Sequence, residues 1–182
     1  MLRLMTSAPL IIRPAQPGEA AALAALARDS FLDKFGAMYR PEDLATFLAE
    51  QHTPEIVAAQ LANPAYRIML ATRDGALAGY CKLVLACGWP EHARGARAIE
   101  LKQLYTAAGA TGGGIGGALM DWALGEAGAA GADEIQLSVF SGNEGAQRFY
   151  HRYGFAKVAD IHFMVGEQRD EEFLFARMMS PP

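Results

Sequence analysis

Cysteine is scarce in this sequence. Only Cys81 and Cys87 occur among 182 residues, six positions apart and in apolar surroundings. So few thiols exclude a disulfide framework and a thiolate metal centre, and we expect both cysteines to be reduced core side chains. The 4 histidines form no i,i+4 pair and have no carboxylate at ligand spacing, so no metal site is predicted.

The sequence also lacks an excess of positive charge. Its 16 Lys and Arg residues stand against 20 Asp and Glu residues, which leaves a formal charge of −4 at pH 7. No global positive field is therefore available to hold a polyanion. This balance argues against nucleic acid and acidic membrane surfaces as partners.

Long hydrophobic runs are missing as well. The longest stretch without a formal charge, residues 103–120, contains six glycines among its eighteen residues, so it is no transmembrane helix. The apolar start, residues 1–15, is too brief and too poorly terminated for a secretory signal. We expect a cytoplasmic protein that neither spans nor binds a membrane.

What is present is the patterning of one mixed α/β domain over residues 1–182. The composition, 52% hydrophobic and 20% charged, is that of an ordinary globular chain. Apolar runs and turn signals predict strands at 10–13, 66–72, 76–86, 97–106, 135–139, 158–165 and 173–179. Helical spacing and capping residues predict helices at 18–35, 41–51, 56–61, 112–128 and 143–153. No repeat or linker divides this order of elements.

Five glycines separate the strand predicted at 97–106 from the helix that follows it, at positions 112, 113, 114, 116 and 117. Bare backbone N–H groups and the helix dipole at such a junction can hold an anion, and a phosphate-bearing ligand is the natural guest. The alternative is that the glycines only permit tight packing between strand and helix.

Three phosphate-binding patterns compete for this loop. A P-loop requires Gly-Lys-Ser/Thr, but Ala118 follows Gly117 here. The dinucleotide fingerprint fits Gly112, Gly114 and Gly117, yet it also requires an acid at the end of the next strand, and residues 139–142 contain none. The third pattern is a diphosphate loop of the form Q/R-x-x-G-x-G/A, which residues 111–116 follow at every position except the first.

At this loop the sequence resembles the GNAT N-acetyltransferase superfamily. The family pattern N-x-x-A-x-x-x-Y-x-x-x-G-F is present downstream, with every spacing kept, as Asn143, Ala146, Tyr150, Gly154 and Phe155. Four further segments, 31–35, 41–44, 100–105 and 162–166, resemble the polyamine/diamine acetyltransferase branch.

The loop departs from the family at two positions. Thr111 stands where Gln or Arg is usual, and Gly113 stands where a basic residue is frequent. We therefore expect a reduced affinity for a diphosphate.

The resemblance implies a GNAT fold and acetyl-CoA as the acetyl donor, with no metal. The fold is a mixed, mostly antiparallel sheet of about seven strands, flanked by helices and splayed between the strands at 97–106 and 135–139. The donor's diphosphate is expected on the loop amides, and its pantetheine arm beside the strand at 97–106. The implied cofactor contacts are Leu104, Tyr105, Thr106, Thr111, Gly112, Gly113, Gly114, Ile115, Gly116, Gly117 and Asn143. For Asn143 the alternative is an ordinary helix N-cap.

Two residues are candidates for proton transfer. The phenol of Tyr150, with an ordinary pKa near 10, suits a proton donor to a departing thiolate; the alternative is an aromatic packing residue beside Phe149. Glu100 lies on the strand that feeds the glycine loop, where some family members carry the general base. Its alternative is a carboxylate paired with Lys102 or an arginine, with ordered water as the proton acceptor. Transfer is expected to be direct, in a ternary complex, without a covalent acetyl-enzyme.

The acceptor is predicted to be a small cationic amine such as a polyamine. Residues 14–62 carry three bases and seven acids, a local balance of −4: Glu19, Asp29, Asp33, Glu42, Asp43, Glu50 and Glu55. An acidic rim would attract a cation, although several of these acids occupy helix first turns, where the helix dipole alone explains them.

Two other functions stay open from the sequence: a non-catalytic acyl-CoA-binding sensor and a Rossmann-type dinucleotide-binding protein. A homodimer is the candidate assembly.

Overall fold

The computed structural model describes residues 8–110 and 112–180. Its strands are β1 (Ile11–Pro14), β2 (Tyr66–Arg73), β3 (Ala76–Val84), β4 (Ala98–Thr106), β5 (Glu134–Phe140), β6 (Ala156–Val165) and β7 (Gln168–Met178). Its longer helices are α1 (Ala20–Phe35), α2 (Pro41–Gln51), α3 (Pro54–Ala62), α4 (Ile115–Ala129) and α5 (Glu144–Arg152). The predicted order of strands and helices is confirmed.

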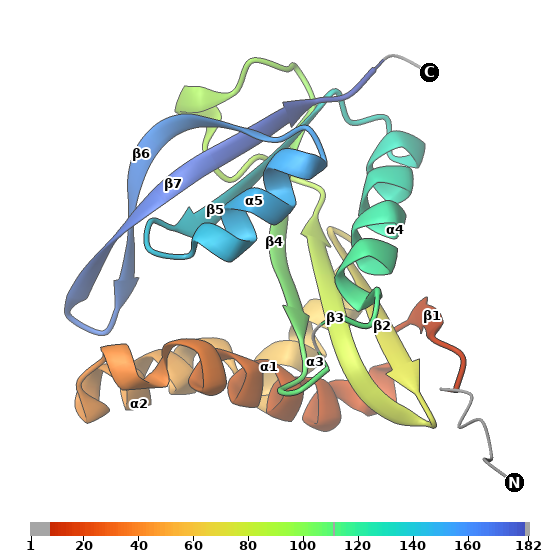
Figure 1. Ribbon diagram of the computed structural model, residues 1–182, viewed down its shortest axis with the longest axis vertical. Coiled ribbons are helices and arrows are strands. Elements are labelled where there is room, and N and C mark those ends of the chain that lie inside the picture. Colours follow the sequence, from red (N-terminus) through yellow and green to blue (C-terminus); the bar gives the residue numbers. More distant parts are fainter. Residues whose placement is uncertain (1–7, 111, 181–182) are drawn as a thin grey trace, which may run out of the picture.

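The seven strands form one open sheet in the order β1-β2-β3-β4-β5-β7-β6 (Figure 1). Every neighbouring pair is antiparallel except β4 and β5, which run parallel. That parallel pair is joined only from Ala98–Glu134 to Glu100–Gln136, and beyond it the two strands continue without pairing with each other. The mixed, mostly antiparallel sheet with a central splay is thereby confirmed.

Helices cover both faces of the sheet, and the alternation of side chains along β2 shows how. Ile68 and Leu70 belong to a buried cluster with α1 and α3, whereas Met69 and Ala71 belong to another with α4. Successive side chains of a strand point to opposite faces, so α1 and α3 lie on one face and α4 on the other. Figure 1 shows α5 in front of β5 and β7, away from the N-terminal helices.

Short-range signals account for several element ends. The side chain of Thr53 caps α3 by accepting a hydrogen bond from the N–H of Ile56 at 3.3 Å. Asp74 and Gly75 join β2 to β3 with φ values of 52° and 75°. Two successive residues in the left-handed region give the turn whose twist matches a hairpin, as the Asp-Gly pair predicted.

The last strand differs from its prediction. β7 begins at Gln168, five residues before the predicted start at 173, and its pairing with β6 closes at Val165–Gln168. The added residues include Arg169, Asp170 and Glu171, whose charges hide a strand from a hydrophobicity pattern. Asp170 is nevertheless buried and accepts a hydrogen bond from the Tyr39 hydroxyl, whereas Arg169 and Glu171 on either side of it are exposed.

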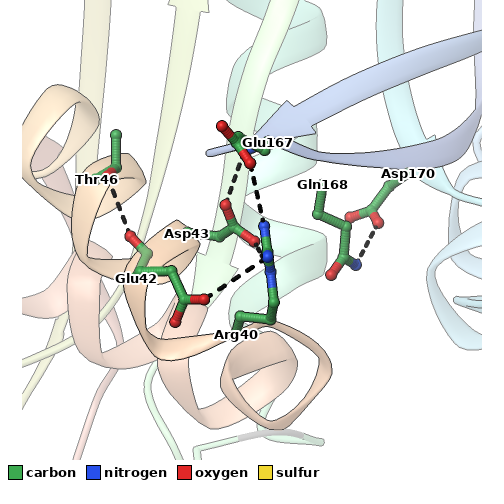
Figure 2. A network of polar contacts seen from close by, with 7 residues as sticks. All are labelled: Arg40, Glu42, Asp43, Thr46, Glu167, Gln168 and Asp170. Carbon is green, nitrogen blue, oxygen red and sulfur yellow. Dashed lines mark hydrogen bonds and ion pairs between the residues drawn. The ribbon is translucent and has the colours of Figure 1, made fainter.

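An ionic network holds the turn between β6 and β7 against the start of α2 (Figure 2). Asp43 accepts hydrogen bonds from Arg40 Nε and from the N–H of Glu167, both at 2.7 Å. Its side chain is 3% exposed. Arg40 and the Glu167 N–H hold the pKa of Asp43 below its ordinary value. The network therefore fixes how the β6–β7 hairpin meets α2.

Candidate functional site

A cavity of about 250 Å³ lies at the splay between β4 and β5. Both strands contribute to its walls, together with α1, α2, α5 and the hairpin of β6 and β7. Five residues proposed from the sequence line it: Glu100, Leu104, Tyr105, Asn143 and Tyr150. The structure thus brings the two proton-transfer candidates and part of the implied cofactor set to one place.

Tyr150 reaches the cavity from α5 and is 8% exposed. Burial raises the pKa of its phenol above the ordinary value, with smaller contributions from Tyr105 and Cys81. The side chain therefore holds its proton at neutral pH, as a proton donor must. Its ring also packs near Phe149 and Phe155, with centroid separations of 5.4 and 6.0 Å. Both the catalytic and the packing interpretations of Tyr150 fit this position.

Asn143 caps α5, as its alternative interpretation predicted. Its side-chain oxygen accepts a hydrogen bond from the N–H of Ala146 at 3.1 Å. The residue lines the cavity as well. The capping role is therefore observed, and the position beside the cavity is compatible with the predicted contact to a ligand.

The glycine loop divides into two parts. Gly112 and Gly114 have φ values of 81° and 76°, which L side chains rarely adopt, and Gly114 is the N-cap of α4. A Cβ at Gly117 would lie 3.1 Å from Tyr153 Oη, and one at Gly116 would lie 3.5 Å from the Phe149 ring. The first two glycines shape the loop, and Gly117 allows the close approach of Tyr153 to α4, whereas a Cβ at Gly116 would make an ordinary contact.

Other predicted cofactor contacts lie outside the cavity. Thr106 pairs with Gly79 at the end of β4, and Ile115 is buried at the start of α4. Thr111 lies outside the described residues.

Arg73 is a residue of this loop region that sequence reasoning missed. It ends β2, and its Nη2 donates a hydrogen bond to the carbonyl oxygen of Gly113 at 3.0 Å. A Cβ at Gly113 would lie 2.8 Å from Arg73 Nη1. The guanidinium group therefore occupies the space beside the one loop position where the family often has a basic side chain. Nothing local marks this contact, because 40 residues separate its two ends.

Glu100 sits at the cavity wall with its side chain 15% exposed. Its Oε1 lies 3.7 Å from Lys102 Nζ, so the pairing expected as the alternative role is present. A carboxylate beside an ammonium can still accept a hydrogen bond from a substrate amine, and the position suits either role.

Glu172 on β7 is a second cavity carboxylate, and no sequence signal pointed to it. Burial raises the pKa of Glu172 above the ordinary value, a hydrogen bond with Ser138 lowers it, and Asp170 raises it. Its Oε2 is buried without a hydrogen-bond partner among the described residues. The predicted strand began at residue 173, so the first five residues of β7, Glu172 among them, were not assigned to a strand.

The acidic N-terminal segment does not form the cavity rim. None of its seven acids, all in the described part of the chain, lines the cavity. Glu19 instead receives hydrogen bonds from Arg13 at 2.6 and 2.8 Å, and Asp43 belongs to the network of Figure 2. The expectation of an acidic rim was wrong: the residues of this segment that line the cavity are mostly aromatic, among them Phe31, Phe35 and Phe47.

Over residues 8–110 and 112–180, no three His, Cys, Asp or Glu side chains gather where they could hold a metal ion. Within the same ranges no helix is long and apolar enough to cross a membrane. Cys81 is buried and Cys87 half-buried, and neither forms a disulfide.

Comparison with known proteins gives consistent matches. The model of the acetyltransferase (GNAT) family matches residues 26–155. An uncharacterized N-acetyltransferase of Mycobacterium tuberculosis is 31% identical over 85% of this chain and 94% of its own length. Another, from Lactobacillus delbrueckii subsp. lactis, is 26% identical over 85% of this chain and 89% of its own.

Solved structures share the fold. The PaiA N-acetyltransferase of Thermoplasma acidophilum, in complex with coenzyme A, has a TM-score of 0.77 at 21% identity, covering 94% of this chain and 99% of that one. YncA of Salmonella typhimurium, solved with its cofactor acetyl-CoA, has a TM-score of 0.66 at 18% identity, with 96% of each chain covered. With a splayed sheet, a glycine loop at the start of α4 and a family match across most of its length, this chain belongs to the GNAT family of N-acetyltransferases.

Proposed function

We propose that the protein transfers the acetyl group of acetyl-CoA to the primary amine of a small molecule. The observation that carries the proposal is the splay of β4 from β5, which opens a cavity where Tyr150 meets residues of β4 that do not pair with β5. The coenzyme A and acetyl-CoA bound by the two solved neighbours support the choice of donor.

The donor would lie along β4 and end at the glycine loop. Its diphosphate would be held by backbone N–H groups of residues 112–117 at the start of α4, where the helix dipole favours an anion. The loop itself carries no charged side chain, so the guanidinium of Arg73 would supply the neighbouring positive charge. Thr111 is proposed to contribute its N–H to the same group.

The pantetheine arm would add to the exposed edge of β4. Beyond Glu100 this edge has no partner strand in β5, so backbone groups near Leu104, Tyr105 and Thr106 can pair with the amides of the arm. The side-chain nitrogen of Asn143 would contact the arm from the opposite side of the splay.

The reaction needs a neutral amine, a polarised thioester and a proton for the departing sulfur. A primary amine with a pKa of about 10.4 is protonated at pH 7, so Glu100 or ordered water would first take its proton. The nitrogen lone pair then attacks the thioester carbon, and the C–S bond breaks. Tyr150 gives its proton to the thiolate of coenzyme A, and the attacking nitrogen loses one proton, through water, to the phenolate of Tyr150. The products are a neutral amide and free coenzyme A, with the phenol restored. Holding both substrates together makes this a direct transfer without a covalent intermediate.

A small cationic amine, such as a polyamine, is the acceptor that the sequence suggested. The N-terminal acids no longer support it, since they do not line the cavity. What supports a cationic amine is now the cavity carboxylate of Glu172, since Glu100 is paired with Lys102.

Two features outside the cavity stay as proposals. A homodimer would have an edge to pair through, because β6 is an outer strand and its Met164 is 52% exposed. A cytoplasmic location is likewise retained as a prediction.

The test is a thermal-shift titration with acetyl-CoA and, separately, with NADH, followed by mass spectrometry of a broad amine panel for acetylated products. We expect stabilisation by acetyl-CoA only, and acetylation of at least one amine. Stabilisation by NADH without a response to acetyl-CoA would replace the proposal with dinucleotide binding. Acetyl-CoA binding without acetylation of any amine would indicate the non-catalytic sensor.

A further inference from the structure

The wall of the cavity formed by the N-terminal helices is aromatic. Phe31 and Phe47 lie with their ring centroids 4.7 Å apart, and Phe47 continues to Phe163 of β6 at 5.7 Å. On the other side, Phe31 leads to Phe35 at 5.3 Å, and Phe35 leads to Phe140 of β5 at 6.2 Å. These five rings, here called the aromatic wall, all line the cavity.

Only part of the aromatic wall is buried in the core. Phe31 and Phe47 are 5% and 6% exposed, but Phe163 is 37% exposed. Apolar surface of these rings that is exposed to water raises the free energy of the protein. A flat apolar ligand would cover this surface and remove that cost. The wall therefore suits a ligand with an aromatic or similarly flat apolar body.

The charges at the cavity suit one positive charge and not several. Four formally charged side chains line it among the described residues: Lys34, Glu100, Lys102 and Glu172. Glu100 is paired with Lys102, and Lys34 is exposed. A nearby histidine adds no charge at pH 7, because burial and Lys82 lower the pKa of His52 to about 4.

That leaves Glu172 as the carboxylate able to receive a cation. Its Oε2 has no partner among the described residues, while its neighbour Asp170 already accepts hydrogen bonds from the Tyr39 hydroxyl and from Gln168 Nε2. Burial raises the pKa of the Tyr105 phenol on β4, and the nearby carboxylate of Glu172 raises it further. An ammonium group beside Glu172 would compensate a buried carboxylate that is otherwise costly.

We propose that the acceptor is a monoamine with an aromatic body, whose ring lies against the aromatic wall and whose amine is received at Glu172. This inference rests on the proposed acetyl transfer and narrows its acceptor. A polyamine carries several positive charges when protonated, and the cavity offers compensation for one. Its flexible chain would also cover the aromatic wall less completely than a ring.

A matched substrate panel tests the inference in the intact protein. We compare kcat/KM for phenethylamine, n-butylamine, putrescine, spermidine and phenylalanine with acetyl-CoA at fixed ionic strength. The expected order places phenethylamine at least ten-fold above n-butylamine and above both polyamines. Spermidine or putrescine equal to or better than phenethylamine would overturn the inference while leaving acetyl transfer intact. Phenylalanine above phenethylamine would also overturn it, since the preferred acceptor would then be a zwitterion.

Two pairs of variants locate the binding groups. Glu172→Gln should raise the KM for phenethylamine at least ten-fold and leave the KM for acetyl-CoA unchanged, whereas Glu171→Gln, on the exposed neighbour, should change neither. Phe163→Ala should reduce the preference for phenethylamine over n-butylamine at least three-fold, and Met164→Ala should not.

Phe163 and Met164 are both exposed, so these two variants keep the test decisive if Glu172→Gln fails to fold. An unchanged preference in Phe163→Ala would refute the aromatic contact. The absence of acetylation of any amine by the wild-type protein would instead refute the proposed function.

Discussion

Replacing Gly79 by alanine should weaken both the fold and the donor site, because no space exists for a methyl group there. Gly79 lies on β3 between Thr106 of β4 and the start of α4. A Cβ would lie 2.7 Å from the backbone oxygen of Tyr105 and 2.9 Å from Ile115 Cγ2. The oxygen belongs to a paired strand and cannot rotate away, so β3, β4 or α4 must shift.

The expected loss of stability follows from two opposing effects. Overpacking a filled core site costs about 1–3 kcal/mol. Alanine restricts the unfolded chain more than glycine does, which offsets about 0.4–1 kcal/mol of that cost. A net loss of about 1–2 kcal/mol corresponds to a fall in Tm of about 2–8 °C for a domain of this size. Because Ile115 opens α4 beside the glycine loop, we also expect a higher KM for acetyl-CoA.

Thermal melts, urea unfolding and acetyl-CoA kinetics measure these effects, and Gly125→Ala is the matched control. Gly125 is exposed inside α4, and a Cβ there would have no atom within 4 Å. Its replacement should stabilise the helix by about 0.5–1 kcal/mol and leave the KM for acetyl-CoA unchanged. A Gly79→Ala protein with the wild-type urea midpoint and the wild-type KM would refute the packing argument.

Four further outcomes are expected. Tyr150→Phe should lower kcat about ten- to a thousand-fold without changing the Kd of acetyl-CoA, and an unchanged rate with chemistry limiting would exclude Tyr150 as the acid. Arg73→Gln should raise the KM for acetyl-CoA about ten-fold at unchanged kcat, through loss of a charged hydrogen bond worth about 1.5 kcal/mol; steady-state kinetics decide it. Burial lowers the pKa of Lys82 to about 8, so the unfolded chain binds the proton more strongly and wild-type stability should rise between about pH 8 and 10.4. Urea midpoints should show this rise in the wild type and not in Lys82→Met. Cys81→Ala should keep its activity in the amine assay, because burial raises the pKa of this thiol and direct transfer needs no cysteine.

Elements whose cause is local could be predicted from the sequence. The cap at Thr53, the turn at Asp74 and Gly75, and the cap at Asn143 each depend on residues within three positions of one another. The order of strands and helices follows from such signals and from apolar periodicity. The family resemblance supplied the splay, which periodicity alone does not reveal.

Features that join distant elements could not be predicted. Charge density suggested that the N-terminal acids surround a substrate, but Asp43 instead binds the N–H of Glu167, 124 residues away. Arg73 reaches Gly113 across 40 residues. Glu172 belongs to a strand whose charged first half gives no strand pattern. In each case the sequence shows the charge, and only the fold shows what surrounds it.

The two sides of the splay differ in the groups that form them. This difference explains why the sequence indicated the donor more directly than the acceptor. The proposed donor side would use backbone groups of one strand, one loop and one helix start, so its requirements appear in the sequence as glycines and caps at fixed spacing. The proposed acceptor side is the part of the cavity lined by side chains of α1, α2, β5, β6 and β7, and no spacing within the sequence relates them. A site that binds the donor through backbone groups tolerates few residue types at the positions that form it. A site lined by side chains can differ in sequence with each acceptor. The acceptor therefore has to be inferred from the rings and the carboxylate that the fold brings together.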